Sequence, residues 1–113
     1  MIVRNDTKGT VLAESCILAD KFTSRFMGLM GKKCLEPGHA LLIVPCNSIH
    51  MFFMSFPLDI IFINRHNRVA HLIENMPPWK VSKIIFGAKS AIEVPVGTIK
   101  STNTSIGDAI IFF

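Results

Sequence analysis

Short apolar segments separated by turn residues dominate the sequence from Ala40 onward, and this pattern constrains the fold more than any other feature. Most of these segments are too short for a typical helix, and they are rich in β-branched and aromatic residues, as β-strands are. We therefore expect a fold built mainly from short strands. The predicted strands are Ala40–Pro45, Ser48–Met54, Leu58–Asn64, Arg68–Glu74, Lys80–Ala88, Ser90–Pro95 and Asp108–Phe113.

Turn residues also predict how some of these strands are connected. The chain opens with a predicted hairpin, in which Ile2–Asn5 and Thr10–Ala19 flank a turn that ends at Gly9. A second hairpin is predicted where the residues "NRHN" join Leu58–Asn64 to the next strand. The residues "GTIKSTN", from Gly97 to Asn103, predict a helical turn.

One segment has a helical period instead. Phe22, Phe26, Leu29 and Met30 recur at intervals of three and four residues, which places them on one face of a helix. The prediction is therefore a mostly β (α+β) fold with one main α-helix over about residues 21–31. The strands would form a compact, largely antiparallel β-barrel or sandwich-like sheet, because a parallel sheet would need more crossover helices.

Length and charge bound the organisation and the partners. The 113 residues contain no linker or repeat, so we expect a single domain over residues 1–113. Twelve basic and eight acidic residues give a net charge of +4, and Lys32–Lys33 is the only adjacent basic pair. Nucleic-acid binding normally requires a concentrated basic patch, so we expect no nucleic-acid partner. The sequence does not determine the oligomeric state.

Three cysteines and the apolar segments bear on the cellular compartment. Cys16, Cys34 and Cys46 have no metal-ribbon spacing, and an odd number of cysteines fits a reducing compartment. The N-terminal residues are charged, unlike a signal peptide. The longest apolar stretch, Ile49–Ile63, is interrupted and shorter than the roughly 20 residues of a membrane-spanning helix. These features predict a cytoplasmic protein with no membrane partner.

Five motifs in a fixed order resemble one known family. They are "SRFMGLMGKKCL" from Ser24, "LLIVPCNSIHMFFMSFPLDIIFIN" from Leu41, "PW" at Pro78, "AIEVPVGT" from Ala91 and "IGD" from Ile106. Together they resemble domain of unknown function family 192, over nearly the whole chain from about residue 13. The resemblance implies a compact β-rich domain with one helix. It implies no established activity, substrate or cofactor.

Two polar residues interrupt apolar strands and would need partners if they are buried. His50 lies between Ile49 and Met51, and Asp59 lies within "PLDIIF". Arg25, reaching them from the predicted helix, could complete a polar network with both. Such a network either fixes the packing of the helix or forms the polar end of a ligand pocket.

Apolar residues around this network complete the predicted site. Met27, Phe52, Met54 and Trp79 could supply apolar contacts to a ligand, since methionine lines adaptable binding surfaces as well as cores. We expect a non-catalytic binding module that takes a small molecule or peptide in a cleft between the helix and the His50 strand. No cofactor is expected.

Two alternatives remain open. Cys46, His50 and Met54, with Met27 or Met30, could bind Cu(I) or Zn(II), although neighbours among the first three would lie about 13 Å apart on a straight strand. A small cysteine-dependent enzyme would need a base beside Cys46 to activate the thiol. No pair of carboxylates indicates acid–base hydrolysis, because Asp59, Glu74, Glu93 and Asp108 lie on different predicted elements.

Overall fold

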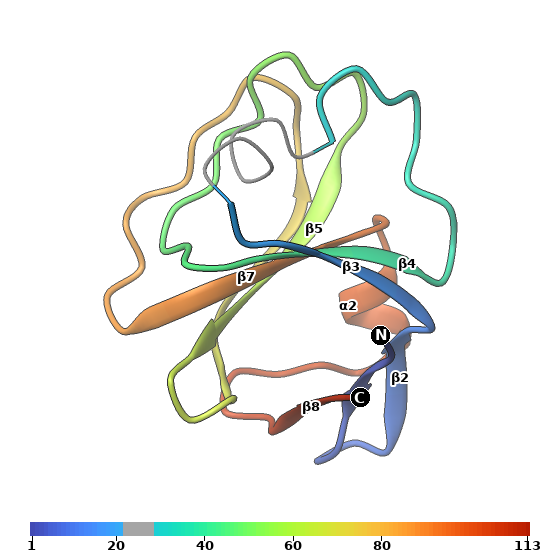
Figure 1. Ribbon diagram of the computed structural model, residues 1–113, viewed down its shortest axis with the longest axis vertical. Helices are drawn as coiled ribbons and strands as arrows, with labels where there is room; N and C mark the ends of the chain where they lie inside the picture. The colour runs from blue at the N-terminus through green and yellow to red at the C-terminus, as the bar shows by residue number, and fades with distance from the viewer. Residues whose placement is uncertain (22–28) are drawn as a thin grey trace.

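The computed structural model describes residues 1–21 and 29–113, which form two β-sheets (Figure 1). The smaller sheet is antiparallel and has the order β2-β1-β8. Its strands are β1 (Val3–Asn5), β2 (Thr10–Ala13) and β8 (Ile110–Phe112). The sheet therefore joins the two ends of the chain.

The larger sheet has five strands in the order β3-β4-β7-β5-β6. β3 and β4 are parallel, and the other neighbouring pairs are antiparallel. The strands are β3 (Ser15–Ala19), β4 (His39–Ile43), β5 (Leu58–Asn64), β6 (Val69–Met76) and β7 (Ala88–Val94), and helix α2 (Thr98–Ser101) follows β7. The predicted mostly β, largely antiparallel fold is confirmed in its sandwich-like form.

Two hydrophobic cores lie on opposite faces of the larger sheet. Successive side chains of a strand point to opposite faces, so Ile61 and Ile63 of β5 lie in one core while Ile60 and Phe62 lie in the other. The first core lies between the larger sheet, the smaller sheet and α2. The second core lies under the connecting segments 44–57 and 77–87, which Figure 1 shows above the sheet.

The predicted strand Thr10–Ala19 is divided between the two sheets. The break falls at Glu14, where the N–H groups of Glu14 and Ser15 both donate to the Gly38 carbonyl, at 2.8 and 3.0 Å. Gly38 directly precedes β4, so the Ser15 bond begins the parallel pairing of β3 with β4, and β2 ends just before it at Ala13. A single apolar segment thereby connects the two layers.

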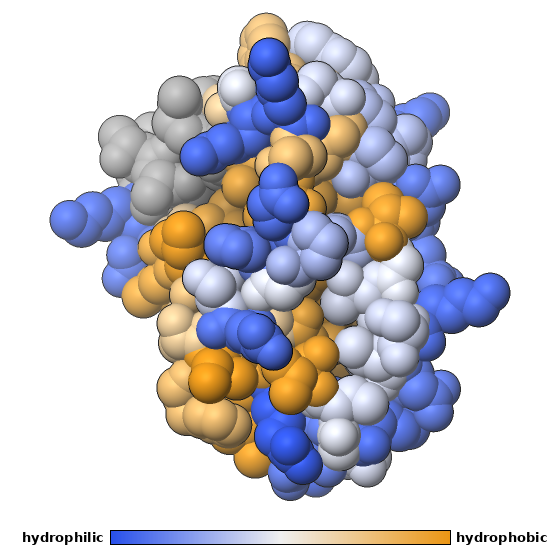
Figure 2. All heavy atoms as spheres, turned by 90° about the vertical axis from the view of Figure 1, so that its right-hand side faces the viewer, coloured by the Kyte–Doolittle hydropathy of each residue, from blue (hydrophilic) through white to orange (hydrophobic). Residues whose placement is uncertain are grey.

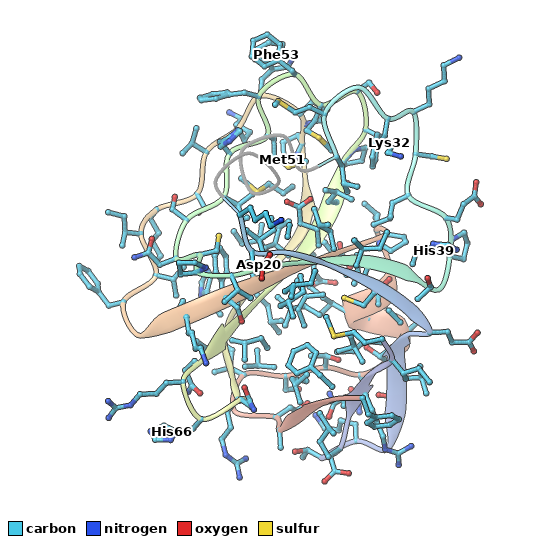
Figure 3. All side chains as sticks on the ribbon, in the orientation of Figure 1. Asp20, Lys32, His39, Met51, Phe53 and His66 are labelled. Atoms are coloured by element: carbon cyan, nitrogen blue, oxygen red, sulfur yellow. The ribbon has the colours of Figure 1, made fainter. Side chains whose placement is uncertain are left out.

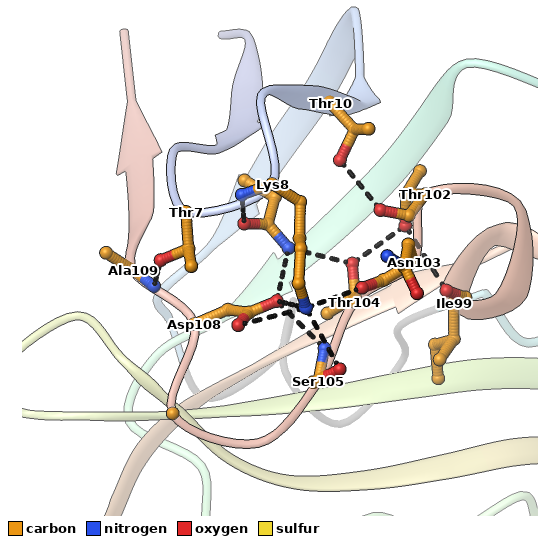
Figure 4. A network of polar contacts seen from close by, with 12 residues as sticks. Thr7, Lys8, Thr10, Ile99, Thr102, Asn103, Thr104, Ser105, Asp108 and Ala109 are labelled. Atoms are coloured by element: carbon orange, nitrogen blue, oxygen red, sulfur yellow. Dashed lines mark hydrogen bonds and ion pairs between the residues drawn. The ribbon is translucent and has the colours of Figure 1, made fainter.

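A polar network with a buried carboxylate at its centre joins the smaller sheet to the segment after α2 (Figure 4). The Lys8 ammonium donates to the Asn103 carbonyl at 2.9 Å, the Ser105 hydroxyl at 3.0 Å and Asp108 Oδ2 at 3.0 Å. The Asn5 side-chain amide donates to Asp108 Oδ2 at 2.9 Å. Asp108 is buried, and these donors allow its charge to be held there.

Two segments that we predicted to be strands are not strands in the structure. The main part of the predicted helix lies outside the described residues. Ser48–Met54 is irregular apart from one isolated bridge between His50 and Val81, and residues 80–87 contain only the other half of that bridge. Of the predicted helix over about 21–31, residues 22–28 are not described, whereas the predicted helical turn is confirmed as α2.

The surface is mixed in character. Figure 2 shows hydrophilic side chains interspersed with separate hydrophobic patches on the right-hand side of Figure 1. No helix within residues 1–21 and 29–113 is long and apolar enough to cross a membrane.

Candidate functional site: an exposed aromatic cluster

Segments 44–57 and 77–87 are hydrogen-bonded to each other, which positions the predicted site residues. Met51 N–H donates to the Lys80 carbonyl at 2.7 Å, and Trp79 N–H donates to the Met51 carbonyl at 2.7 Å. Further along, Ser82 N–H donates to the Ile49 carbonyl at 2.8 Å. The two segments therefore run antiparallel and hold each other over the second core.

Side-chain hydrogen bonds explain why this pairing is not a regular sheet. The Ser82 hydroxyl accepts the Ile49 N–H at 2.9 Å, and the Ser48 hydroxyl donates to the Ser82 carbonyl at 3.1 Å. Here serine hydroxyls make hydrogen bonds that backbone N–H and carbonyl groups would make in a regular ladder. Buried Ile49 and Met51 anchor the first segment, and buried Ile85 anchors the second.

Four rings from the two segments form a continuous cluster, which we call the aromatic cluster: His50, Phe52, Phe53 and Trp79. His50 stacks on Phe52 with ring centroids 5.0 Å apart, and Phe52 lies 6.2 Å from Trp79. Phe53 meets Trp79 edge to face at 4.9 Å. These separations are in the range of favourable aromatic pairs.

Three of the four rings are exposed although they are large and apolar. Phe52, Phe53 and Trp79 have 41%, 66% and 58% of their surface exposed. Figure 3 shows Phe53 pointing outward from one end of the molecule, whereas Met51 lies inside it. Contiguous exposed apolar surface of this kind marks interaction sites more often than isolated exposed residues do.

Backbone strain coincides with the cluster. Phe53 and Trp79 have φ angles of 62° and 69°, in the left-handed region that bulky side chains seldom adopt. Each such residue costs about 1–3 kcal/mol and persists only where its surroundings enforce it. Strain at two ring-bearing positions is what projects both side chains from their turns.

The structure places the remaining predicted site residues apart from these rings. Met54 is buried in the second core. Asp59 is fully buried, and its carboxylate accepts the backbone N–H groups of Asn75, Gly97 and Ile99 at 2.8–3.1 Å. It therefore faces α2 on the other side of the sheet. Arg25 and Met27 lie outside the described residues.

The ligands of the metal alternative lie in the same region. The half-buried Cys46 thiol donates to the Ser48 carbonyl at 3.2 Å. Within the part of the chain that the structure describes, no three His, Cys, Asp or Glu side chains are grouped closely enough to hold an ion. The geometry therefore adds no support for Cu(I) or Zn(II) at Cys46, His50 and Met54.

A separate pocket lies on the other side of the larger sheet. It has a volume of about 590 Å³ and is lined by β2, the turn at 37–38, the turn at 95–97 and α2. The Thr98 and Thr102 hydroxyls in its wall donate to the carbonyls of Pro95 and Thr98, at 2.7 and 2.6 Å. These wall hydroxyls are already bonded within the protein, so the aromatic cluster remains the stronger candidate.

Comparison with known proteins then identifies the family. The family model of DUF192, described as "Uncharacterized ACR", matches residues 2–112. The chain belongs to the DUF192 family. A UPF0127 protein of Thermococcus sibiricus is 41% identical over 114 residues, which cover 94% of this chain and 71% of the relative. A UPF0127 protein of Pyrococcus abyssi is 31% identical, covering 96% of this chain and 95% of the relative.

A solved structure supports the fold of this DUF192 protein. A protein of unknown function from Novosphingobium aromaticivorans has a TM-score of 0.86 and 21% identity. The similarity covers 98% of this chain and 83% of that chain. At this identity it shows the fold alone.

One ring of the aromatic cluster was missing from the predicted site of this DUF192 protein, and one buried acid was not singled out. Phe53 completes the aromatic cluster, and the sequence signal was its place beside Phe52 in an apolar run. Glu93 is 6% exposed in the middle of the larger sheet, and burial raises its pKa to about 7. The signal for Glu93 was a single acid inside the apolar segment "SAIEVP".

Proposed function

We propose that this DUF192 protein is a non-catalytic binding protein whose aromatic cluster takes an apolar group carrying a negative charge. The ligand is a small molecule or a peptide side chain of this chemistry. One observation carries the proposal: Phe52, Phe53 and Trp79 contact one another while remaining largely exposed. Aromatic rings in such clusters contribute strongly to binding because they bury a large area with little loss of side-chain freedom.

The positive charge of the two segments supports a negatively charged group on the ligand. Residues 44–57 contain no acidic residue, and residues 77–87 contain Lys80 and Lys83 but no acid. Both lysines are exposed, so their ammonium groups attract an anion approaching the cluster. A ligand with an apolar body and a carboxylate, sulfonate or phosphate complements this surface.

The second core, which lies beneath the aromatic cluster, supports an apolar body for the ligand. Met51 and Met54 are buried under the two segments, and methionine adapts its shape to neighbouring groups. Rings that rest on this layer can shift slightly to accept a ligand without disturbing the sheet. The predicted contribution of Arg25 and Met27 remains part of the proposal.

Anilinonaphthalene sulfonate tests the proposal, because it is an aromatic anion with its own fluorescence. Trp79 is the only tryptophan, and the chain has no tyrosine, so protein emission reports on Trp79 alone. We expect saturable binding with energy transfer from Trp79 to the probe. Phe53→Ala should weaken binding about tenfold, equivalent to about 1.4 kcal/mol for the lost ring.

The matched control is Phe86→Ala. Phe86 is 92% exposed in the same segment as Trp79, and no ring contact joins it to the described cluster. This variant should bind the probe as the wild type does, and uncharged phenylnaphthylamine should bind more weakly than the sulfonate. Equal losses in the Phe53 and Phe86 variants, with unchanged circular dichroism, would contradict the proposal.

A further inference from the structure

The pocket beside α2 lies outside the proposed function, and it is large enough for a small organic molecule. Its volume of about 590 Å³ is within the roughly 300–1,000 Å³ of typical ligand pockets. In Figure 1, β2 and α2 lie toward the right, on the side that faces the viewer in Figure 2. Leu12 and Ala13 in its wall belong to the first core, so the larger sheet separates this pocket from the aromatic cluster.

Two glycines in the wall show that the space around their turns is unfilled. A Cβ atom added at Gly38 or at Gly97 would meet no other atom within 4 Å. Gly38 belongs to the turn before β4, and Gly97 belongs to the turn before α2. Neither turn is therefore closed off by side chains packed against it.

The wall offers hydrogen-bond acceptors, but most of its donors are already used. The Thr98, Ser101 and Thr102 hydroxyls donate to backbone carbonyls at 2.7, 3.3 and 2.6 Å. Five wall N–H groups also donate to protein oxygens: those of Glu14, Gly97, Thr98, Ser101 and Thr102. A hydroxyl that donates one hydrogen bond keeps lone pairs that can accept another. These hydroxyls can therefore accept hydrogen bonds from a ligand, but their protons are not free to be donated to it.

Charge selects between the two signs of ligand. Glu14 is exposed at the pocket, and none of the described residues that line it is Lys, Arg or His. An anion in this pocket would meet a like charge and few free donors, which makes the loss of its hydration costly. A cation would meet an opposite charge together with hydroxyl acceptors.

We propose that this pocket binds the ammonium group of a small organic amine, with Glu14 as its counter-ion. The Thr98 and Ser101 hydroxyls accept hydrogen bonds from the ligand, and its carbon skeleton packs against the apolar wall at Val11 and Val96. An ammonium group has three donors and no acceptor, so it complements a wall of this composition. The inference is independent of the aromatic cluster, which takes an anion.

Cyclohexylammonium chloride is the probe, with cyclohexanol and cyclohexanecarboxylate as controls that share its ring. We expect saturable changes in the backbone amide signals of Ala13 and Ser101 in nitrogen-15 NMR spectra at low salt. Both controls should bind at least fivefold more weakly than the amine, because one lacks the charge and the other has the opposite charge.

Variants separate binding in the pocket from simple attraction to a surface charge. Glu14→Gln should weaken binding of the amine about fivefold, near the upper range for one solvent-exposed ion pair. Val96→Trp and Ser101→Trp should each weaken it at least fivefold although Glu14 is retained, because a large ring on either residue reduces the space. Glu74→Gln, at an exposed position on β6, should bind the amine as the wild type does.

Three outcomes would overturn the inference. The first is the absence of saturable changes with cyclohexylammonium, and the second is a control ligand that binds as tightly as the amine. The third is undiminished binding in the Glu14→Gln variant or in both tryptophan variants. Loss of amine binding would leave the proposed function standing, because anilinonaphthalene sulfonate binding depends on Phe53 and not on Glu14.

Discussion

Asp59 and Glu93 each interrupt an apolar strand, but their surroundings differ. Asp59 accepts three backbone N–H groups, whereas burial raises the pKa of Glu93. The sequence correctly indicates that a buried Asp59 needs partners. Its donors among the described residues are backbone N–H groups 16, 38 and 40 residues away, and the His50 side chain that we expected is not one of them. Backbone donors carry no signature in the sequence, so only the packing of β6 and α2 against β5 reveals them.

Glu93 makes stability depend on pH in an unusual direction. Its pKa is raised from 4.5 to about 7, so the folded protein keeps a proton that the unfolded chain releases. Stability should therefore fall as the pH rises from about 4.5 to 7, by about 3 kcal/mol in total from this group. Glu93→Gln should remove this dependence and be more stable than the wild type at pH 8.

Urea denaturation of both proteins between pH 5 and pH 8 measures the effect. Glu74→Gln serves as the control, because Glu74 is exposed. Parallel stability curves for the wild type and the Glu93 variant would show that the carboxyl is not held protonated in the folded state.

At the scale of elements, the paired segments 44–57 and 77–87 show where local pattern is insufficient. Both contain runs of apolar residues that predict strands. Serine side chains and residues with positive φ interrupt the ladder, so neither becomes a strand. The apolar residues correctly indicated that these segments cover a core. The conformation of each segment, however, depends on its hydrogen bonds to the other segment.

The strain at Phe53 predicts a difference between two substitutions. Glycine adopts a φ of 62° readily, whereas alanine does not. Phe53→Gly should therefore be more stable than Phe53→Ala by about 1 kcal/mol, and both should lose the same affinity for anilinonaphthalene sulfonate. Thermal unfolding of the two variants measures the difference. The same pair at Phe52, which has no positive φ, should give the reverse order of stability.

At the scale of the whole molecule, the Lys8 network joins the two ends of the chain. Lys8 and Asp108 are 100 residues apart in sequence, and their contact ties the β1–β2 turn to the segment before β8. Burial opposes ionisation of Asp108, but hydrogen bonds from Asn5, the Ser105 N–H and Lys8, together with the Lys8 charge, lower its pKa.

Lys8→Met should consequently destabilise the protein by about 1–3 kcal/mol near neutral pH. Because the pKa of Asp108 is lowered in the folded state, its contribution is present above 3.8 and is lost as the pH falls below that value. The difference between wild type and variant should shrink accordingly in acid. Chemical denaturation at pH 7 and pH 3 tests this, with exposed Lys100→Met as the control.

The sequence by itself determined the mostly β composition, the β1–β2 and β5–β6 hairpins and the helical turn of α2. These features depend on residue period and turn chemistry within a few neighbouring positions, which a sequence displays directly. It also placed His50, Phe52 and Trp79 in one candidate site, and the structure brings their rings together.

Tertiary structure alone decided the division of Thr10–Ala19 between two sheets and the parallel pairing of β3 with β4. It also decided that Asp59 is saturated while Glu93 has no partner among the described residues. Each of these outcomes depends on which distant backbone groups come within hydrogen-bonding range. Distances of that kind are set by the packing of whole layers, and no local pattern of residues encodes them.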